Sequence, residues 1–164
     1  MYTDFSDLDD NSRLWVYQAD RKLTENEKEF ILMNGKAFVD SWTAHNKTLH
    51  ASIEVKYDQF IVLAVDETKS QATGCSIDKS VHFIRAIENE LNINLLDKSK
   101  VAFLKGEEVV LENLPSIKSK VEGNEISADL LTFNNMVTTK ADFNSKWLIP
   151  ASESWMSRFF KEKV

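Results

Sequence analysis

The chain has few of the residues that build disulfides, flexible linkers and membrane spans. Its one cysteine, Cys75, excludes an internal disulfide and indicates the redox compartment only weakly. Four glycines and two prolines indicate short loops. No apolar run approaches the roughly 18 residues that a membrane helix needs. The N-terminus lacks the basic and apolar regions of a signal peptide. The sequence therefore predicts a cytoplasmic protein without membrane contact.

Positive charge is also scarce. Twenty Lys and Arg against 26 Asp and Glu give a net charge of −6. This argues against a nucleic-acid surface, because such surfaces usually need clustered Lys and Arg. Hydrophobic and charged fractions of 43% and 28% are typical of globular proteins, and ten Phe and four Trp can fill a core. We expect a single domain over residues 1–164, with residues 1–12 as a polar lead-in.

Hydrophobic periodicity predicts strands that alternate with helices. Strand patterns cover residues 13–20, 49–57, 60–65, 101–105 and 109–112, and helical patterns cover residues 24–42 and 76–91. The order strand, helix, strand, strand, helix, strand, with one added strand, predicts an α+β protein with a ferredoxin-like split βαβ core. We expect two helices on one face of a mostly antiparallel sheet. Residues 113–164 are predicted to be an extension that ends in a helix and packs on this core.

Local signals place the starts of the two main helices. Thr24 and Glu27 have the spacing of a capping box, in which a hydroxyl and a carboxylate each satisfy a free backbone N–H. Ser76 is the predicted N-cap of the second helix. Gly35 lies in the apolar stripe of the first helix, which indicates a close approach between this helix and the sheet.

The segment 74–80, Gly-Cys-Ser-Ile-Asp-Lys-Ser, is the strongest candidate for function. A helix N-terminus carries partial positive charge and unpaired N–H groups, which can lower a thiol pKa or hold an anion. We expect the first and third main strands to run parallel, which brings the residues after them to the same end of the sheet. The predicted ligand-binding residues are Arg21, Asp66, Gly74, Cys75, Ser76 and Lys79.

Three hypotheses stay open for this segment. In the first, the protein is a non-enzymatic module that binds a small-molecule or anionic ligand, or a protein partner such as a second copy in a homodimer. In the second, Cys75 is the catalytic residue of a thiol-dependent enzyme, or the sensor of a redox-sensitive protein. In the third, Cys75 is a small, half-buried residue without a functional role.

Other chemistry has little support in the sequence. His45 is expected at the opposite end of the sheet from Cys75, and His82 lies seven positions beyond it, so neither is predicted to activate the thiol. The spacing of His45 and His50 is not that of a zinc site, and no metal is predicted. The chain contains no GxGxxG or GxSxG motif, and its one Gly-Lys pair precedes alanine. No cofactor is therefore expected.

Four segments resemble a known family. They are Trp-Val-Tyr-Gln-Ala-Asp-Arg at 15–21, Trp-Thr-Ala-His at 42–45, the segment 74–80, and Ser-Trp-Met-Ser-Arg-Phe at 154–159. They resemble a family of small proteins from Bacteroidetes-type bacteria whose members often carry the label "ABC transporter ATPase". The resemblance covers nearly the whole chain and implies a bacterial protein, but no catalytic residues. The chain lacks a phosphate-binding loop and a Leu-Ser-Gly-Gly-Gln signature, so its motifs do not support ATPase activity.

Overall fold

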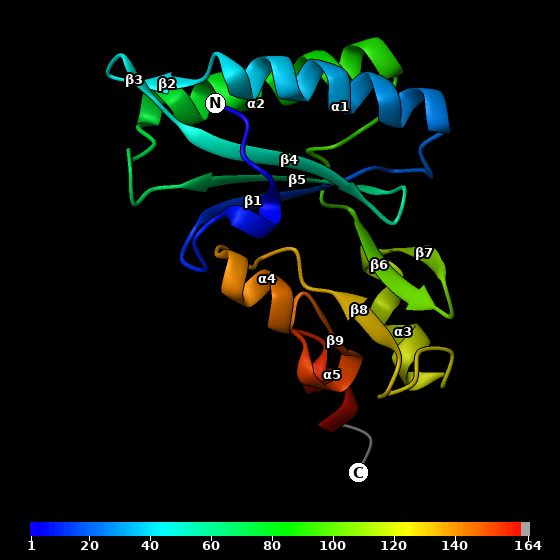
Figure 1. The fold of residues 1–164 in the computed structure, drawn as a ribbon. Coiled ribbons are helices and arrows are strands. Elements are labelled where there is room, and N and C mark those ends of the chain that lie inside the picture. Colours follow the sequence, from blue (N-terminus) through cyan, green and yellow to red (C-terminus); the bar gives the residue numbers. More distant parts are fainter. Residues whose placement is uncertain (162–164) are drawn as a thin grey trace.

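The computed structural model describes residues 1–161, which form two larger antiparallel sheets, a small hairpin and the helices that cover them (Figure 1). The strands are β1 (Arg13–Gln18), β2 (Thr43–Ala44), β3 (Lys47–Thr48), β4 (His50–Lys56), β5 (Phe60–Asp66), β6 (Lys100–Lys105), β7 (Glu108–Asn113), β8 (Leu131–Phe133) and β9 (Leu148–Pro150). The α-helices are α1 (Glu25–Asp40), α2 (Gly74–Leu91), α3 (Ile117–Glu122), α4 (Lys140–Lys146) and α5 (Ser157–Lys161), and short 3₁₀ turns are η1 (Phe5–Asp7), η2 (Leu114–Ser116) and η3 (Ala151–Glu153). The predicted α+β class is confirmed.

The first sheet has the strand order β1-β5-β4, and both of its pairings are antiparallel. Our expectation that β1 and β5 run parallel is wrong. Strand β5 follows β4 through a tight hairpin and therefore reverses direction, whereas helix α1 returns the chain so that β4 runs parallel to β1. Strand β5 lies between these two parallel strands and opposes both. As a result, Asp20 and Asp66 lie at opposite ends of the sheet.

Strand β6 does not join the first sheet. The three strands of that sheet keep the order and the antiparallel pairing of a split βαβ unit, in which a fourth strand would lie beside β1. Instead β6 belongs to a second sheet with the order β7-β6-β8-β9. The order of the core elements is as predicted, but β1 is left as an edge strand.

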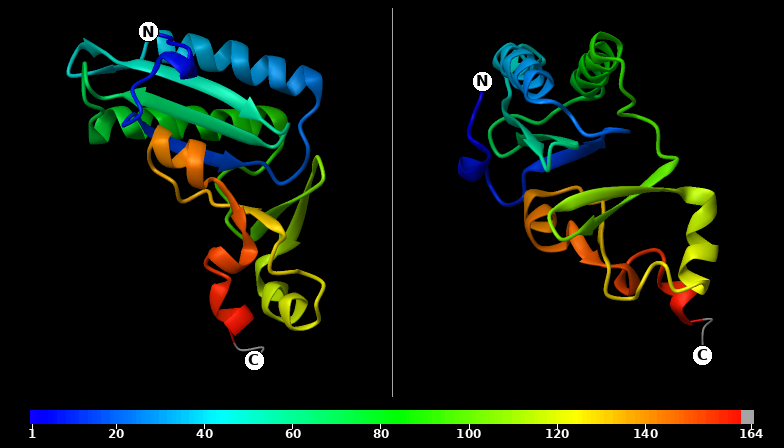
Figure 2. Two further views of the ribbon diagram at one scale, coloured as in Figure 1. Left: turned by 60° about the horizontal axis from the view of Figure 1, so that its bottom comes forward. Right: turned by 90° about the vertical axis from the view of Figure 1, so that its right-hand side faces the viewer.

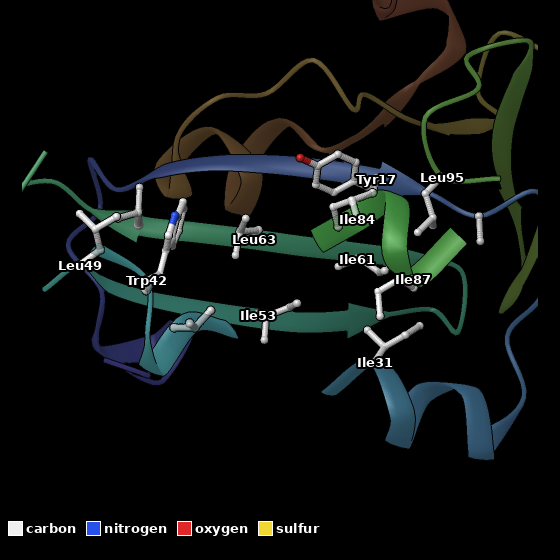
Figure 3. Close-up of a cluster of buried hydrophobic side chains, with 14 of the residues drawn as sticks. Tyr17, Ile31, Trp42, Leu49, Ile53, Ile61, Leu63, Ile84, Ile87 and Leu95 are labelled. Carbon is white, nitrogen blue, oxygen red and sulfur yellow. The ribbon is translucent and has the colours of Figure 1, made fainter. Parts of the chain in front are cut away.

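Helices α1 and α2 lie side by side on one face of the first sheet (Figure 2). The core beneath them is formed by buried side chains of both helices and of all three strands, including Ile31, Trp42, Ile53, Leu63 and Ile84 (Figure 3). The predicted close approach at Gly35 is present, because a Cβ there would lie 2.6 Å from Cδ1 of Ile53 on β4. A larger residue would overlap the Ile53 side chain, which would have to shift to make room.

The extension covers the opposite face of the first sheet. Phe133, Val137, Phe143 and Trp147 form a second core with buried side chains of β1 and β5, and all seven residues of β5 are buried. A third core lies between the second sheet and helices α3 and α5. The first sheet therefore has no open face, which removes the support that such a face would have given to a homodimer.

The first twelve residues are more than a polar lead-in. The Thr3 N–H donates to Ala51 O at 2.8 Å, which pairs this segment with the outer edge of β4. Leu8 and Ser12 are buried, and Leu8 belongs to the second core. The sequence did not predict this packing of residues 1–12, because the few apolar side chains between the acidic residues show no periodicity.

Candidate functional site

Helix α2 begins at a capping box, three residues before the N-cap that was predicted at Ser76. The cap is Thr73 and not Ser76: Oγ1 of Thr73 accepts from the Ser76 N–H at 3.3 Å, and Oγ of Ser76 accepts from the Thr73 N–H at 2.6 Å. Ser76 is buried, and its carbonyl accepts from the Trp42 indole N–H at 2.8 Å. Its polar groups are thus engaged in holding the helix start on the core.

The other predicted residues of this segment face outward. Gly74, Cys75 and Lys79 are exposed, and within residues 1–161 none of their side chains takes part in an ion pair. The prediction that the Cys75 thiol is half-buried is therefore wrong. An exposed thiol on the first turn of a helix is accessible to solutes, whatever its role.

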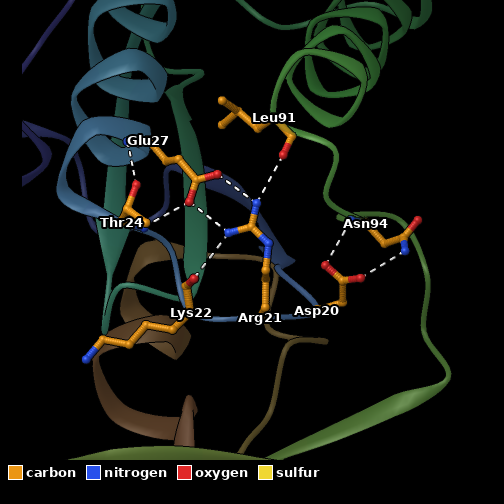
Figure 4. Close-up of polar contacts among 7 residues, drawn as sticks. All are labelled: Asp20, Arg21, Lys22, Thr24, Glu27, Leu91 and Asn94. Carbon is orange, nitrogen blue, oxygen red and sulfur yellow. Dashed lines mark hydrogen bonds and ion pairs between the residues drawn. The ribbon is translucent and has the colours of Figure 1, made fainter.

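Arg21 lies at the far end of helix α2. Its guanidinium binds both carboxylate oxygens of Glu27 at 2.8 and 2.7 Å and donates to the carbonyl of Leu91, the last residue of α2, at 3.0 Å (Figure 4). Leu91 lies 16 positions after Cys75 on helix α2, so this contact is roughly 24 Å from Cys75 at 1.5 Å per residue. The structure does not bring Arg21 and Cys75 together.

Asp66 is also engaged locally. Its carboxylate accepts from the N–H and the hydroxyl of Thr68 at 3.0 and 2.6 Å. Burial raises the pKa of Asp66, but these hydrogen bonds and the one from the Asp9 backbone outweigh burial, and the net pKa is lowered. Asp66 therefore stabilises the turn after β5 as a carboxylate. The six predicted ligand-binding residues do not form one site.

The Arg21–Glu27 pair makes stability depend on pH. Hydrogen bonds from Arg21 lower the pKa of Glu27 to about 2, below the ~4.3 of an unfolded chain. The stabilisation is therefore complete above about pH 5 and is lost as the pH falls toward 2. We expect Arg21→Gln to lower the free energy of unfolding by about 1 kcal/mol at pH 7 and by clearly less near pH 2, where Glu27 is half protonated but the Arg21 hydrogen bond to the Leu91 carbonyl remains.

Urea denaturation at pH 7, 4 and 2 checks this expectation. Lys22→Gln is the matched control, because Lys22 is the exposed neighbour of Arg21 and forms no ion pair within the described residues. If Arg21→Gln lowered the free energy of unfolding equally at pH 7 and pH 2, this would contradict the assignment of the low Glu27 pKa to its pairing with Arg21.

Exposure of Cys75 predicts its behaviour toward alkylating reagents. Iodoacetamide is expected to modify the folded chain to completion without denaturant, as followed by intact mass. Cys75→Ser is expected to change the free energy of unfolding by no more than about 0.5 kcal/mol. Alkylation that occurs only after unfolding would show that Cys75 is a core residue. A fall of more than about 2 kcal/mol in the free energy of unfolding of Cys75→Ser would show the same.

A large cleft lies elsewhere, along the free edge of β1. This β1–β6 cleft has a volume of about 640 Å³ and is lined by all six residues of β1 and by parts of the second sheet. Its remaining walls come from the segments 95–98, 134–138 and 153–155 and from Leu114. The lining thus joins stretches that are distant in sequence, and no local pattern could have predicted it.

A chain of amide contacts fixes one end of the β1–β6 cleft. The Gln18 amide donates to Lys100 O at 3.1 Å and accepts from Asn135 Nδ2 at 3.0 Å. Asn135 in turn accepts from the Trp147 indole N–H at 2.9 Å. These contacts tie the end of β1 to the start of β6 and to the segment after β8.

The opposite end of the cleft is closed by backbone pairing. The Leu14 N–H donates to Thr138 O at 3.0 Å, and the Lys140 N–H donates to Ser12 O at 2.9 Å. Within residues 1–161, no backbone hydrogen bond of this kind joins Val16 to the segment 134–138. The middle of β1 therefore keeps a free edge, and the space beside it is the cleft.

Three of the six large apolar residues that are exposed in the described chain border this one cleft. They are Leu114, Met136 and Trp155, with exposed fractions of 44%, 77% and 48%. Scattered exposed apolar residues are ordinary on a protein surface, but their concentration at a concave site is typical of binding sites. Because the three residues are far apart in the sequence, no local pattern predicts that they lie together.

Neither a three-residue metal cluster nor a membrane-spanning helix occurs in the part of the chain that is described. Residues 1–161 contain no group of three His, Cys, Asp or Glu side chains that could hold a metal ion. No helix among them is long and apolar enough to cross a bilayer.

Comparison of the chain with protein families, curated proteins and solved structures finds no match. The resemblance to the Bacteroidetes family therefore stays a prediction. Function is therefore inferred from the geometry of the chain alone.

Proposed function

We propose that this protein is a binding module that holds a small, largely apolar molecule in the β1–β6 cleft. The observation that carries the proposal is the gathering of Leu114, Met136 and Trp155 around one cleft. Each of these side chains keeps apolar surface in water at a cost of roughly 25 cal/mol per Å². A ligand that covers them regains part of this free energy.

The size and the construction of the cleft also support binding. A volume of about 640 Å³ lies within the range of about 300–1,000 Å³ that is usual for small-molecule sites. The walls come from strands of two sheets, which are held in place by the Gln18–Asn135 and Leu14–Thr138 contacts. Such walls are formed before the ligand arrives, so binding costs little ordering of the protein.

The cleft replaces the Cys75 segment as the centre of the proposal. Cys75 does not line the cleft, and its predicted partners Arg21 and Asp66 are engaged in their own contacts. The thiol-dependent hypothesis has no comparable observation in its favour. The alkylation experiment described above tests it separately.

The neutral dye N-phenyl-1-naphthylamine tests whether the cleft binds apolar molecules. Its fluorescence should rise on saturable binding to the folded protein. Met136→Ala should weaken binding about tenfold, which corresponds to about 1.4 kcal/mol of lost apolar burial. Both the dye affinity and the melting temperature are measured for each variant.

Met33→Ala is the matched control, because Met33 is similarly exposed (68%) on helix α1 and does not line the cleft. This control should leave the dye affinity unchanged. The proposal fails if the dye does not bind saturably, or if the two methionine variants weaken binding equally.

A further inference from the structure

We propose that the ligand of the β1–β6 cleft is a single-chain carboxylic acid, whose carboxylate meets Lys98 and Lys100 and whose chain lies along β1. This inference rests on the proposed function, because it assigns the chemistry of the ligand to the same cleft. It is carried by the charges of the lining and by the shape of the cleft.

Cations in the lining are free of ion pairs. Arg13, Lys98 and Lys100 all line the cleft, and no ion pair of the described residues includes any of them. The chain as a whole has a net charge of −6. A concentration of unpaired cations in one cleft of an acidic protein therefore favours an anionic ligand.

The acidic residues of the lining offset these cations only in part. The carboxylate of Asp97 accepts from the N–H and the hydroxyl of Ser99, both at 2.9 Å, and is thus held within its own turn. Glu153 is the other acidic residue of the lining. The lining therefore carries three cations against two carboxylates, an excess of one positive charge.

The two lysines lie together at one end of the cleft. The carbonyl of Lys100 accepts from the side chain of Gln18, the last residue of β1, and Lys98 precedes Lys100 by two positions. Arg13 begins β1 and is roughly 17 Å away at about 3.3 Å per residue. Its guanidinium lies 5.1 Å from the centre of the Trp15 ring. The lysine end is therefore the stronger site for a single anionic group.

The lining of the cleft extends along the whole of β1. It follows every residue of β1 from Gln18 back to Arg13, and it passes Val16, Val137 and Met136 on the way. A flexible apolar chain attached to a carboxylate fits an elongated space of this kind. Amphiphilic molecules with a bulky polar part would leave these apolar walls uncovered.

Calorimetric titration with monomeric dodecanoate and with 1-dodecanol tests the inference. Lys98→Gln combined with Lys100→Gln should weaken dodecanoate binding about tenfold and change dodecanol binding less than twofold. Raising the salt concentration should weaken only dodecanoate, since screening acts on its charge. From decanoate to dodecanoate, affinity should rise by up to roughly fourfold for each added methylene.

Lys47→Gln combined with Lys118→Gln is the matched control, because both lysines are exposed, unpaired in the described chain and outside the cleft. Equal effects of the two double variants, or equal effects on both probes, would overturn the acid assignment while leaving an apolar site. Binding to vesicles of anionic phospholipid without binding of monomeric dodecanoate would also overturn it. Failure of both probes and of the naphthylamine dye would overturn the proposed function itself.

Discussion

Replacement of Trp42 by alanine is expected to lower the free energy of unfolding by about 3–5 kcal/mol. Trp42 follows helix α1, is 2% exposed and fills the space between the two helices and the first sheet (Figure 3). Its ring lies 5.2 Å from that of Phe38 and 6.5 Å from that of Trp15. Alanine would leave a cavity among these rings. Because native proteins are usually stable by only about 5–15 kcal/mol, such a loss is severe.

The Trp42 indole also has a polar role that can be separated from its volume. Its N–H donates to the carbonyl of Ser76 in the first turn of α2. Trp42→Phe keeps most of the ring but removes this buried hydrogen bond, so we expect a loss of about 1–2 kcal/mol. Urea denaturation followed by circular dichroism measures both losses, with an unchanged dependence on urea concentration.

Trp155→Ala is the control for the loss of a tryptophan. Trp155 is 48% exposed at the rim of the cleft, and its removal should change the free energy of unfolding by about 0.5 kcal/mol or less. A loss below 1 kcal/mol for Trp42→Ala, or equal losses for the two alanine variants, would contradict the packing described here.

Replacement of Phe60 by alanine is expected to cost a similar 3–5 kcal/mol on the other side of the sheet. Phe60 is fully buried at the start of β5, and its ring lies 4.5 Å from that of Phe133 and 5.1 Å from that of Trp147. Both partners belong to the extension. The side chain of Phe60 therefore joins the first sheet to residues 113–164.

Thermal unfolding of the Phe60 variant also tests whether the chain unfolds as one unit. If the sheet and the extension share one core, both near-ultraviolet and far-ultraviolet circular dichroism should report a single transition at a lower temperature. Phe60→Leu is the conservative control, with an expected loss of less than about 1.5 kcal/mol. Two separate transitions in the wild-type chain would show that the extension is an independent domain.

The Cys75 segment shows why motif reasoning failed at the site. A helix N-terminus was predicted near Cys75, and helix α2 does begin there. The gathering of Arg21 and Asp66 depended instead on the relative direction of two strands. That direction follows from which strand lies in the middle of the sheet, and the hydrophobic pattern of a single strand does not contain it.

The position of the β1–β6 cleft depends on which sheet strand β6 joins, which is decided by residues still farther apart in the sequence. Strand β6 was predicted correctly as an element, but its sheet was not. Its pairing with β7 and β8 leaves the edge of β1 free, and that edge became the wall of the cleft. Leu114, Met136 and Trp155 read in the sequence as ordinary apolar residues, because only their common position distinguishes them.

The sequence by itself determined the local structure of this protein. Alternation in residues 49–57, the apolar run at 60–65 and the apolar stripe around Gly35 are short-range patterns, which fix strands, helices and the faces that they bury. Only the tertiary structure decided the partner of β6, the end of the sheet at which Arg21 lies, and the position of the cleft. These features arise from contacts between residues far apart in the chain, and such contacts are selected by the packing of all cores together.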